Sequence, residues 1–154
     1  MQEIIIYTIG KNNSTAIIGL EDEYIKRIRW KISRVQIDLK IKTSSSSQQK
    51  LHEGDALLLK VNPDSYLIAL DERGATMNSE EFASYISSTF ALRNQRISFC
   101  IGGAFGHSSK VISKANFVLS LGQMTFAHKL VPLLLCEQLY RAYTILNKHP
   151  YHKK

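Results

Sequence analysis

The sequence predicts an α/β domain built on a mostly parallel sheet of about five strands, with helices on both faces. Apolar runs of strand length alternate with segments of helical periodicity along the whole 154-residue chain. Most of these runs are almost continuously apolar, which is typical of strands covered on both faces. No linker and no internal repeat divides the chain. We therefore expect one domain spanning residues 1–154.

The amino-terminal part predicts a strand, a helix and a second strand. Glu3–Ile9 is a nearly continuous apolar strand. Apolar residues then recur at helical spacing over residues 16–32, with Ser14 or Thr15 as the N-cap. Residues 35–42 alternate strictly between apolar and polar side chains. This alternation predicts a strand with one solvent-facing side, near an edge of the sheet.

The middle of the chain adds a helix and a third strand. Residues 43–47 form a low-complexity connector of one threonine and four serines. Residues 48–61 have a helical pattern, although Gly54 in the middle weakens it. A buried strand follows at residues 66–70, and we expect residues 71–74 to close it.

Two further strands, at residues 97–101 and 117–121, lead into loops. Before the first of them, Asn78 and Glu81 have the spacing of a capping box for a helix over residues 79–92. Open α/β sheets build their ligand sites from loops at the carboxyl ends of the strands. We therefore expect the functional site after these two strands and treat the preceding chain as scaffold.

The last helix, over residues 130–146, is apolar around nearly its whole circumference. A helix of this kind must be buried on all sides, so we expect it to pack on the sheet and in a homodimer interface. Pro132 fits a helix only in its first turn; the helix therefore begins near Val131 or is kinked there. Glu137 and Arg141 lie one turn apart, either as an ordinary ion pair or as a pair beside the active site.

The composition favours a protein that tolerates a polyanionic partner. Lysine and arginine number 20 and aspartate and glutamate 13, giving a net charge of +7. This excess favours RNA binding, but solubility alone also explains it. No apolar run reaches the length of a membrane span, and the amino terminus lacks the pattern of a signal peptide, so we expect a soluble, unprocessed, cytoplasmic protein. The basic residues gather at the carboxyl end and in one cluster: Lys26, Arg27, Arg29, Lys31 and Arg34.

Several common site chemistries are disfavoured. The glycine-rich segment 102–106 follows the fourth strand, whereas a dinucleotide-binding motif belongs after the first. No glycine-lysine-serine or glycine-lysine-threonine sequence is present for a triphosphate. The histidines lack metal-ligand spacing, so we expect no metal site. Cys100 and Cys136 lie in apolar runs and are expected to be reduced core thiols.

Three ordered motifs and the tail resemble the SPOUT methyltransferases, and most closely their ribosomal large-subunit RNA methyltransferase H group. The matching segments are residues 101–108, 119–128, 137–143 and 150–153. The resemblance implies a carboxyl-terminal trefoil knot, a homodimer, S-adenosylmethionine as methyl donor, and N3 of a pseudouridine in 23S rRNA as acceptor. Because the chain has no separate RNA-binding domain, we expect the substrate to be a whole subunit or ribosome. The competing interpretation is a non-catalytic ribosome-binding protein with an empty pocket.

The resemblance also implies the residues of the site. Those expected to line the cofactor pocket are Leu70, Gly102, Leu121, Gly122, Gln123, Met124, Thr125 and Phe126. Methylation of an imide nitrogen requires a base, for which the unranked candidates are Glu137, His128 and His152. The residues expected to contact RNA are Arg141, Tyr151, His152 and Lys153.

The chain departs from the family pattern next to the last motif loop. Ala127, Lys129 and Pro132 stand where relatives usually have proline, glutamine and arginine. Any role of that arginine in binding or dimerisation is therefore in doubt for this chain. Tyr151 and His152 follow Pro150 at the end of the chain, where we expect them to lie outside the core.

Overall fold

The computed structural model describes residues 1–40, 43–92 and 94–153, and these form one sheet with helices on both faces. All of the strand pairs are parallel, and the strand order is β2-β1-β4-β3-β5. The strands are β1 (Glu3–Ile9), β2 (Lys31–Ile37), β3 (Tyr66–Thr76), β4 (Arg96–Ile101) and β5 (Phe117–Ser120). The helices are α1 (Thr15–Ile25), α2 (Ser46–Lys60), α3 (Ser79–Phe90), α4 (Ser109–Lys114) and α5 (Val131–Leu146). The predicted fold class is confirmed.

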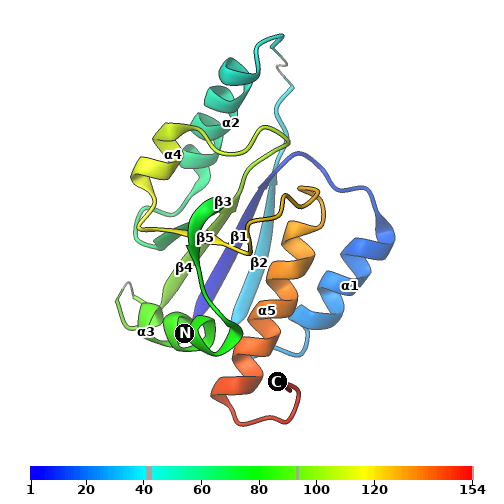
Figure 1. Ribbon diagram of the computed structural model, residues 1–154, viewed down its shortest axis with the longest axis vertical. Coiled ribbons are helices and arrows are strands. Elements are labelled where there is room, and N and C mark those ends of the chain that lie inside the picture. Colours follow the sequence, from blue (N-terminus) through cyan, green and yellow to red (C-terminus); the bar gives the residue numbers. More distant parts are fainter. Residues whose placement is uncertain (41–42, 93, 154) are drawn as a thin grey trace.

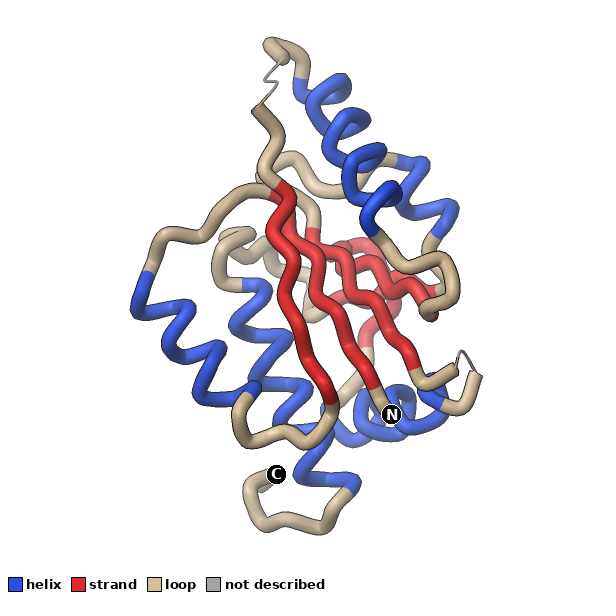
Figure 2. The backbone as a smooth tube through the Cα atoms, turned by 180° about the vertical axis from the view of Figure 1, so that it is seen from behind, coloured by secondary structure: helices blue, strands red, loops and turns tan. Residues whose placement is uncertain are grey.

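Two apolar clusters hold the layers together. The larger joins one face of the sheet to α1, α3 and α5, and the smaller joins the other face to α2 (Figures 1 and 2). Alternate residues of β1 divide between them: Ile4 and Ile6 enter the larger cluster and Tyr7 the smaller. Strands β1, β2, β3 and β4 thus contribute residues to both clusters and are covered by apolar packing on both sides, whereas β5 contributes only to the larger one.

The helix predicted over residues 16–32 is too long. The structure ends α1 at Ile25, and the N–H of Lys26 donates to Asp22 O at 3.0 Å. Trp30 is buried beyond that end, where its ring packs edge-on against Phe90 and Tyr143, at 5.3 and 5.4 Å between centroids. The apolar residues after Ile25 therefore match the helical spacing by coincidence. Ile28 and Trp30 lie in the segment that connects α1 to β2, where they are buried in the core.

The second strand is displaced towards the amino terminus from its predicted range of 35–42. Strand β2 pairs only with β1, and Ile37 lies opposite the last β1 residue, Ile9. Gly10 then turns away with φ +83°, its N–H donating to Ile37 O at 2.8 Å. The described residues 38–40 consequently have no partner strand, and the rest of the predicted strand, residues 41 and 42, lies outside the described ranges. The prediction that this strand lies at a sheet edge is confirmed.

Local signals in the sequence located the starts of α1 and α3, whereas α2 begins at Ser46, inside the predicted connector. The N-cap Ser14 accepts a hydrogen bond from Ile17 N–H at 3.3 Å. The predicted capping box is present, since Glu81 N–H donates to Asn78 Oδ1 at 2.8 Å and Asn78 N–H to Glu81 Oε2 at 3.4 Å. The short helix α4 was not predicted. Its N-cap residue Ser108 lies against α2, which explains Gly54 in the middle of that helix.

Contrary to the prediction, strand β3 does not end at residues 71–74. It continues to Thr76, and both Leu70 and Ala75 lie opposite Leu119 of β5. Residues 71–74 therefore form a bulge, the kind of irregularity that redirects side chains beside functional sites. Gly74 passes so close to β5 that a Cβ there would lie 2.6 Å from Val118 O.

Helix α5 begins at Val131 with Pro132 in its first turn, as one of the two predicted alternatives requires. Leu135 and Leu139 are fully buried within one chain, whereas Leu130 and Leu134 remain 41% and 36% exposed. The all-round apolar pattern is thus explained mostly by the sheet, α1 and α3, and only a limited part is left for a partner. None of the described helices has the length and hydrophobicity of a membrane span. The knot remains a prediction.

Candidate active site

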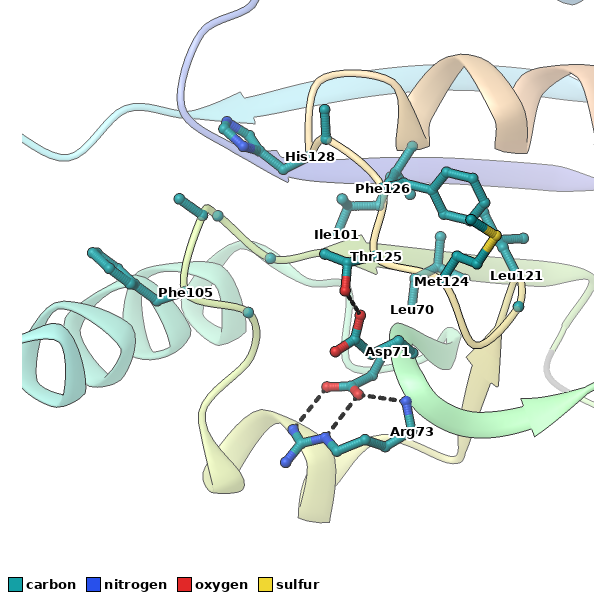
Figure 3. A pocket seen from close by; sticks show the side chains of 18 of the residues that line it. Leu70, Asp71, Arg73, Ile101, Phe105, Leu121, Met124, Thr125, Phe126 and His128 are labelled. Carbon is teal, nitrogen blue, oxygen red and sulfur yellow. Dashed lines mark hydrogen bonds and ion pairs between the residues drawn. The ribbon is translucent and has the colours of Figure 1, made fainter.

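A cavity of about 520 Å³ opens at the carboxyl ends of β3, β4 and β5 (Figure 3). Its walls come from the β3 bulge, the glycine-rich loop after β4, the loop after β5, the first residue of α5 and Lys50 of α2. Cavities of roughly 300–1,000 Å³ with mostly apolar walls are the usual size of small-molecule sites. The sheet thus places the cavity at the edge where the sequence predicts it.

The loop after β4 doubles back on itself and exposes backbone to the cavity. The N–H of Gly106 donates to Gly103 O at 3.0 Å, and Gly106 has φ +81°. A Cβ on Gly102 would lie 2.8 Å from the carbonyl carbon of Gly106, so this close approach requires glycine. A ligand in the cavity therefore meets main-chain groups here.

The loop after β5 is fastened to the β3 bulge by hydroxyl groups. Ser120 Oγ lies 2.8 Å from Gly122 O and 3.1 Å from Glu72 O, and it accepts the Gly122 N–H at 3.0 Å. Thr125 donates its hydroxyl to Glu72 Oε2 at 2.7 Å (Figure 3). The two cavity walls are therefore connected, and a change in the bulge would move the loop.

The β3 bulge brings charge to the cavity. Arg73 donates its backbone N–H and Nε to Asp71 Oδ1 at 2.9 and 3.0 Å, and its Nη2 to Asp71 Oδ2 at 2.9 Å (Figure 3). These hydrogen bonds from Arg73 lower the pKa of the Asp71 carboxyl, which is therefore ionised at neutral pH. Asp71, Glu72 and Arg73 all line the cavity, although the sequence predicts only that they close the strand. Their signal was their position directly after Leu70, at the carboxyl end of a buried strand.

A second polar cluster lies further along α5, where side chains of that helix contact the carboxyl-terminal tail. Glu137 Oε1 accepts from Arg141 Nε at 3.1 Å, from Arg141 Nη2 at 2.5 Å and from the Tyr151 hydroxyl at 3.2 Å. Gln138 donates to Glu137 Oε2 at 2.8 Å. The Arg141 guanidinium lies 4.9 Å from the centre of the Tyr151 ring, and its Nη1 is 3.2 Å from His152 Nδ1. We call Glu137, Arg141, Tyr151 and His152 the tail cluster.

The expectation that Tyr151 and His152 lie outside the core is wrong for Tyr151. Its ring is half-buried and packs edge-on against Tyr140, with 4.6 Å between the ring centres. Burial, together with the neighbouring Glu137 carboxylate, raises the pKa of Tyr151 to about 12. His152 is also half-buried, and its Nε2 lies 3.8 Å from Glu80. The tail returns along α5 because its aromatic ring and Arg141 attract each other.

Comparison with known proteins identifies the family. The family model described as "Predicted SPOUT methyltransferase" matches residues 2–152. This chain belongs to the SPOUT methyltransferase family. Proteins named ribosomal RNA large subunit methyltransferase H are similar over nearly their whole length. That of Carboxydothermus hydrogenoformans is 35% identical over 158 residues, covering 98% of this chain and 99% of the relative, and that of Flavobacterium psychrophilum 39% over 151 residues, covering 96% of each.

Solved structures support the SPOUT fold. A probable methylase family protein from Haemophilus influenzae superposes with a TM-score of 0.55 and 14% identity, covering 98% of this chain and 70% of the other. A putative methylase family protein from Neisseria gonorrhoeae gives a TM-score of 0.52 at 14% identity, covering 99% and 86%. At this identity the likeness concerns the fold alone.

The structure gathers most of the residues that the SPOUT resemblance assigns to the cofactor. Leu70, Gly102 and the loop after β5 line the cavity, and Gln123, which is exposed, is the predicted residue that is not among those lining it. The apolar wall contains Leu70, Leu121, Met124 and Phe126, together with Ile101, Leu119 and Val131. Apolar side chains and exposed backbone are what a neutral purine needs, so this set fits an adenosine-containing methyl donor.

The three candidate bases are not brought together in one chain. His128 is exposed and lines the cavity, where it lies with Phe105 at the end away from Met124 (Figure 3). Glu137 and His152 belong to the tail cluster. Because an α-helix rises about 1.5 Å per residue, Glu137 lies roughly 9 Å along α5 from Val131 at the cavity, with the rest of the cluster beyond it. Lys153, the last predicted RNA contact, is exposed.

The buried histidine and cysteines have structural surroundings. His107 is 4% exposed, and its Nε2 lies 3.0 Å from Cys100 O. Burial lowers the pKa of His107, which is therefore neutral at physiological pH. Burial likewise raises the pKa of the Cys100 and Cys136 thiols, which are inert in this form. Among the described residues, no group of three or more histidine, cysteine, aspartate or glutamate side chains could hold a metal ion.

Proposed function

We propose that this chain transfers a methyl group from S-adenosylmethionine to N3 of a pseudouridine in the 23S rRNA of the large ribosomal subunit. The observation that supports this proposal most directly is the cavity of about 520 Å³, because seven of the eight residues that the family resemblance assigns to the methyl donor line it. The relatives named ribosomal RNA large subunit methyltransferase H cover nearly the whole chain and support the same substrate. With the ribosome as substrate, we expect the protein in the cytoplasm.

The residues of the cavity suit the donor. Leu70, Leu121 and Phe126 would enclose the adenine, and the backbone N–H and C=O groups of the loop after β5 would pair with its edge. The backbone of the loop at Gly102 would approach the rest of the molecule. S-adenosylmethionine supplies an electrophilic methyl group on a positively charged sulfur. The protein's contribution is to exclude water and to hold donor and acceptor in line, which can account for much of the rate.

The acceptor nitrogen must lose its proton as the N–CH₃ bond forms, and we propose different roles for the three candidate bases. His128 stands at the cavity and is free to take that proton. Glu137 already accepts hydrogen bonds from Arg141, Tyr151 and Gln138. Its role would therefore be to hold the tail in position. His152 and Lys153, with Arg141 and Tyr151, would contact the RNA.

We further propose that the protein acts as a homodimer in which the tail cluster of one subunit serves the cavity of the other. Within one chain, the cluster and the cavity are separated along α5. Exposed apolar side chains lie at the cavity end of that helix, namely Phe126, Leu130 and Leu134. A second copy that covers them would remove this apolar surface from water.

The test combines donor binding with methyl transfer. Isothermal calorimetry should detect S-adenosylmethionine binding, and the protein should methylate large subunits or ribosomes prepared without the modification, as read by mass spectrometry of 23S rRNA fragments. A short free oligonucleotide should be a much poorer substrate. No donor binding at millimolar concentration, together with binding to ribosomes, would favour the non-catalytic interpretation instead.

A further inference from the structure

The turn between α1 and β2 lies beside the tail, although more than 100 residues separate them in the sequence. The guanidinium of Arg27 is 5.7 Å from the centre of the Tyr140 ring, and the same ring packs against Tyr151 at 4.6 Å. Both views of the backbone place the end of α1 and the carboxyl terminus at the same end of the molecule (Figures 1 and 2). Arg27 and Tyr151 of the tail therefore both contact the ring of Tyr140.

This turn carries three exposed cations, Lys26, Arg27 and Arg29, which we call the basic turn. No carboxylate of the described residues lies within ion-pair distance of any of them. The other two members of the sequence cluster differ, because Lys31 pairs with Glu3 at 3.0 Å and Arg34 with Glu21 at 3.1 Å. Within this sequence cluster, the basic turn is therefore the part whose charge no carboxylate of the described residues neutralises.

The tail extends the same positive surface. Lys148, His149 and Lys153 are exposed on it. Acidic groups near it include Glu80, which faces His152, Glu137, which pairs with Arg141, and the exposed Glu23 of α1. Glu3, Glu21 and Asp22 are held in ion pairs with Lys31 and Arg34. The balance of charge on this surface is positive.

Cations beside half-buried aromatic rings suit RNA chemistry. Lysine and arginine side chains neutralise phosphates and release counterions, and guanidinium planes and tyrosine rings stack on unpaired bases. Arg27 and Arg141 each lie over a tyrosine ring of this surface. A lipid bilayer would require an apolar face beside the cations, whereas Lys26, Arg27 and Arg29 alternate with the buried Ile28 and Trp30.

We propose that the basic turn and the tail form one RNA-binding surface, in which Lys26, Arg27 and Arg29 bind phosphates flanking the nucleotide that the tail contacts. This inference rests on the proposed function for the identity of the RNA. It assigns a binding role to a segment that the sequence analysis treated as scaffold. It also gives the substrate contacts at two points along the rRNA.

The test compares two double variants that remove equal charge. Lys26→Gln with Arg29→Gln weakens the basic turn, and Lys60→Gln with Lys114→Gln removes two exposed lysines from α2 and α4 on the other face of the sheet. Binding to large ribosomal subunits is measured by co-sedimentation from about 50 to 200 mM salt. Each lost phosphate contact should reduce the slope of log affinity against log salt by about 0.7–0.9. We expect the first variant to lose both contacts and on the order of tenfold in affinity near 100 mM salt, and the control to match the wild type.

Two further measurements separate this inference from the proposed function. S-adenosylmethionine affinity and kcat at saturating ribosomes should be unchanged in the Lys26→Gln, Arg29→Gln variant, while KM for ribosomes rises. Arg27→Lys should keep the salt slope and Arg27→Gln should lower it. A wild type that binds subunits through the basic turn but transfers no methyl group would overturn the proposed function and leave this surface intact. Equal binding and equal salt slopes for both double variants, or binding of the basic turn to anionic lipid vesicles but not to ribosomes, would overturn the inference.

Discussion

The two ends of α5 present different surroundings to a ligand. At its amino end, the cavity offers main-chain groups and apolar side chains held by short loops, and the glycine at position 102 is needed because backbone passes against backbone. At its carboxyl end, the tail cluster is a network of long charged and aromatic side chains. Backbone and apolar walls suit a neutral adenosine group, whereas arginine and tyrosine suit a charged, stacked polymer. The proposed donor site and the proposed RNA site therefore lie at opposite ends of one helix and share no residues.

The largest expected effect on stability comes from the buried leucines of α5, because they hold both ends of this helix against the core. Leu139 is fully buried, so Leu139→Asp should abolish folding, because a buried unpaired charge adds to the lost apolar burial and together they cost more than about 4 kcal/mol. The exposed Leu134 is the matched position on the same helix. Leu134→Glu should keep the circular dichroism spectrum and shift the sedimentation coefficient from dimer to monomer. A Leu134→Glu protein that remains a dimer would remove α5 from the interface.

The next effect separates the cavity end from the tail end. A Cβ at Gly102 would lie 2.8 to 3.1 Å from backbone atoms of Gly106 and His107, so Gly102→Ala must displace the loop. We expect a loss on the order of 10- to 100-fold in S-adenosylmethionine affinity by calorimetry, with ribosome binding unchanged. Gly19→Ala in α1 is the control, because nothing lies within 4 Å of its Cβ and alanine favours a helix by about 1 kcal/mol. Equal donor affinity in both variants would show that the loop does not shape the donor site.

A smaller effect is expected from the tail. Tyr151→Ala removes an edge-on ring pair with Tyr140 and a cation–π contact with Arg141, each worth about 0.5–1.5 kcal/mol. For a domain of this size the melting temperature should fall by about 2–8 °C. Turnover on ribosomes should fall with donor affinity unchanged. Tyr151→Phe keeps the ring and should restore the melting temperature while losing the hydroxyl bond to Glu137. An unchanged melting temperature in the alanine variant would show that the tail is solvated and does not contribute to stability.

The sequence predicted those features that depend on neighbouring residues. Ser14 and the Asn78–Glu81 pair mark helix starts because an N-cap acts over three residues. The end of β2 at Ile37 was missed because Gly10 of another strand sets it. Asp71 and Arg73 were missed at the site because the bulge that turns them to the cavity depends on pairing with Leu119. The packing of Tyr151 on Tyr140 was missed because no pattern in the sequence near residue 151 indicates contact with a residue of α5.

The smallest effect concerns Glu53 of α2, which lies behind the glycine loop at the cavity end. It is 7% exposed, and its Oε2 has no hydrogen-bond partner among the described residues. A Cβ on Gly103 would lie 2.8 Å from that oxygen, so the carboxyl packs directly against the loop. Burial raises the pKa of Glu53, although a hydrogen bond from Gln49 and the electrostatic influence of His128 oppose the shift.

The sign of its pH dependence follows from this raised pKa. The folded state holds the proton of Glu53 more tightly than the unfolded state, so its contribution to stability is fully present below the unfolded pKa, about 4.3, and is lost as pH rises through the folded pKa. Glu53→Gln does not titrate. The free energy of unfolding of this variant relative to wild type, from urea titrations at several pH values between 4 and 8, should therefore increase with pH and then level off. The gain should stay below about 3 kcal/mol, the cost of one unsatisfied buried polar group. Asp55→Asn, which breaks an exposed pair with Lys110 at 2.9 Å, should change stability by less than about 1 kcal/mol. A difference between Glu53→Gln and wild type that is flat across this range would mean that the carboxyl behind the glycine loop keeps the same charge in the folded and unfolded chain.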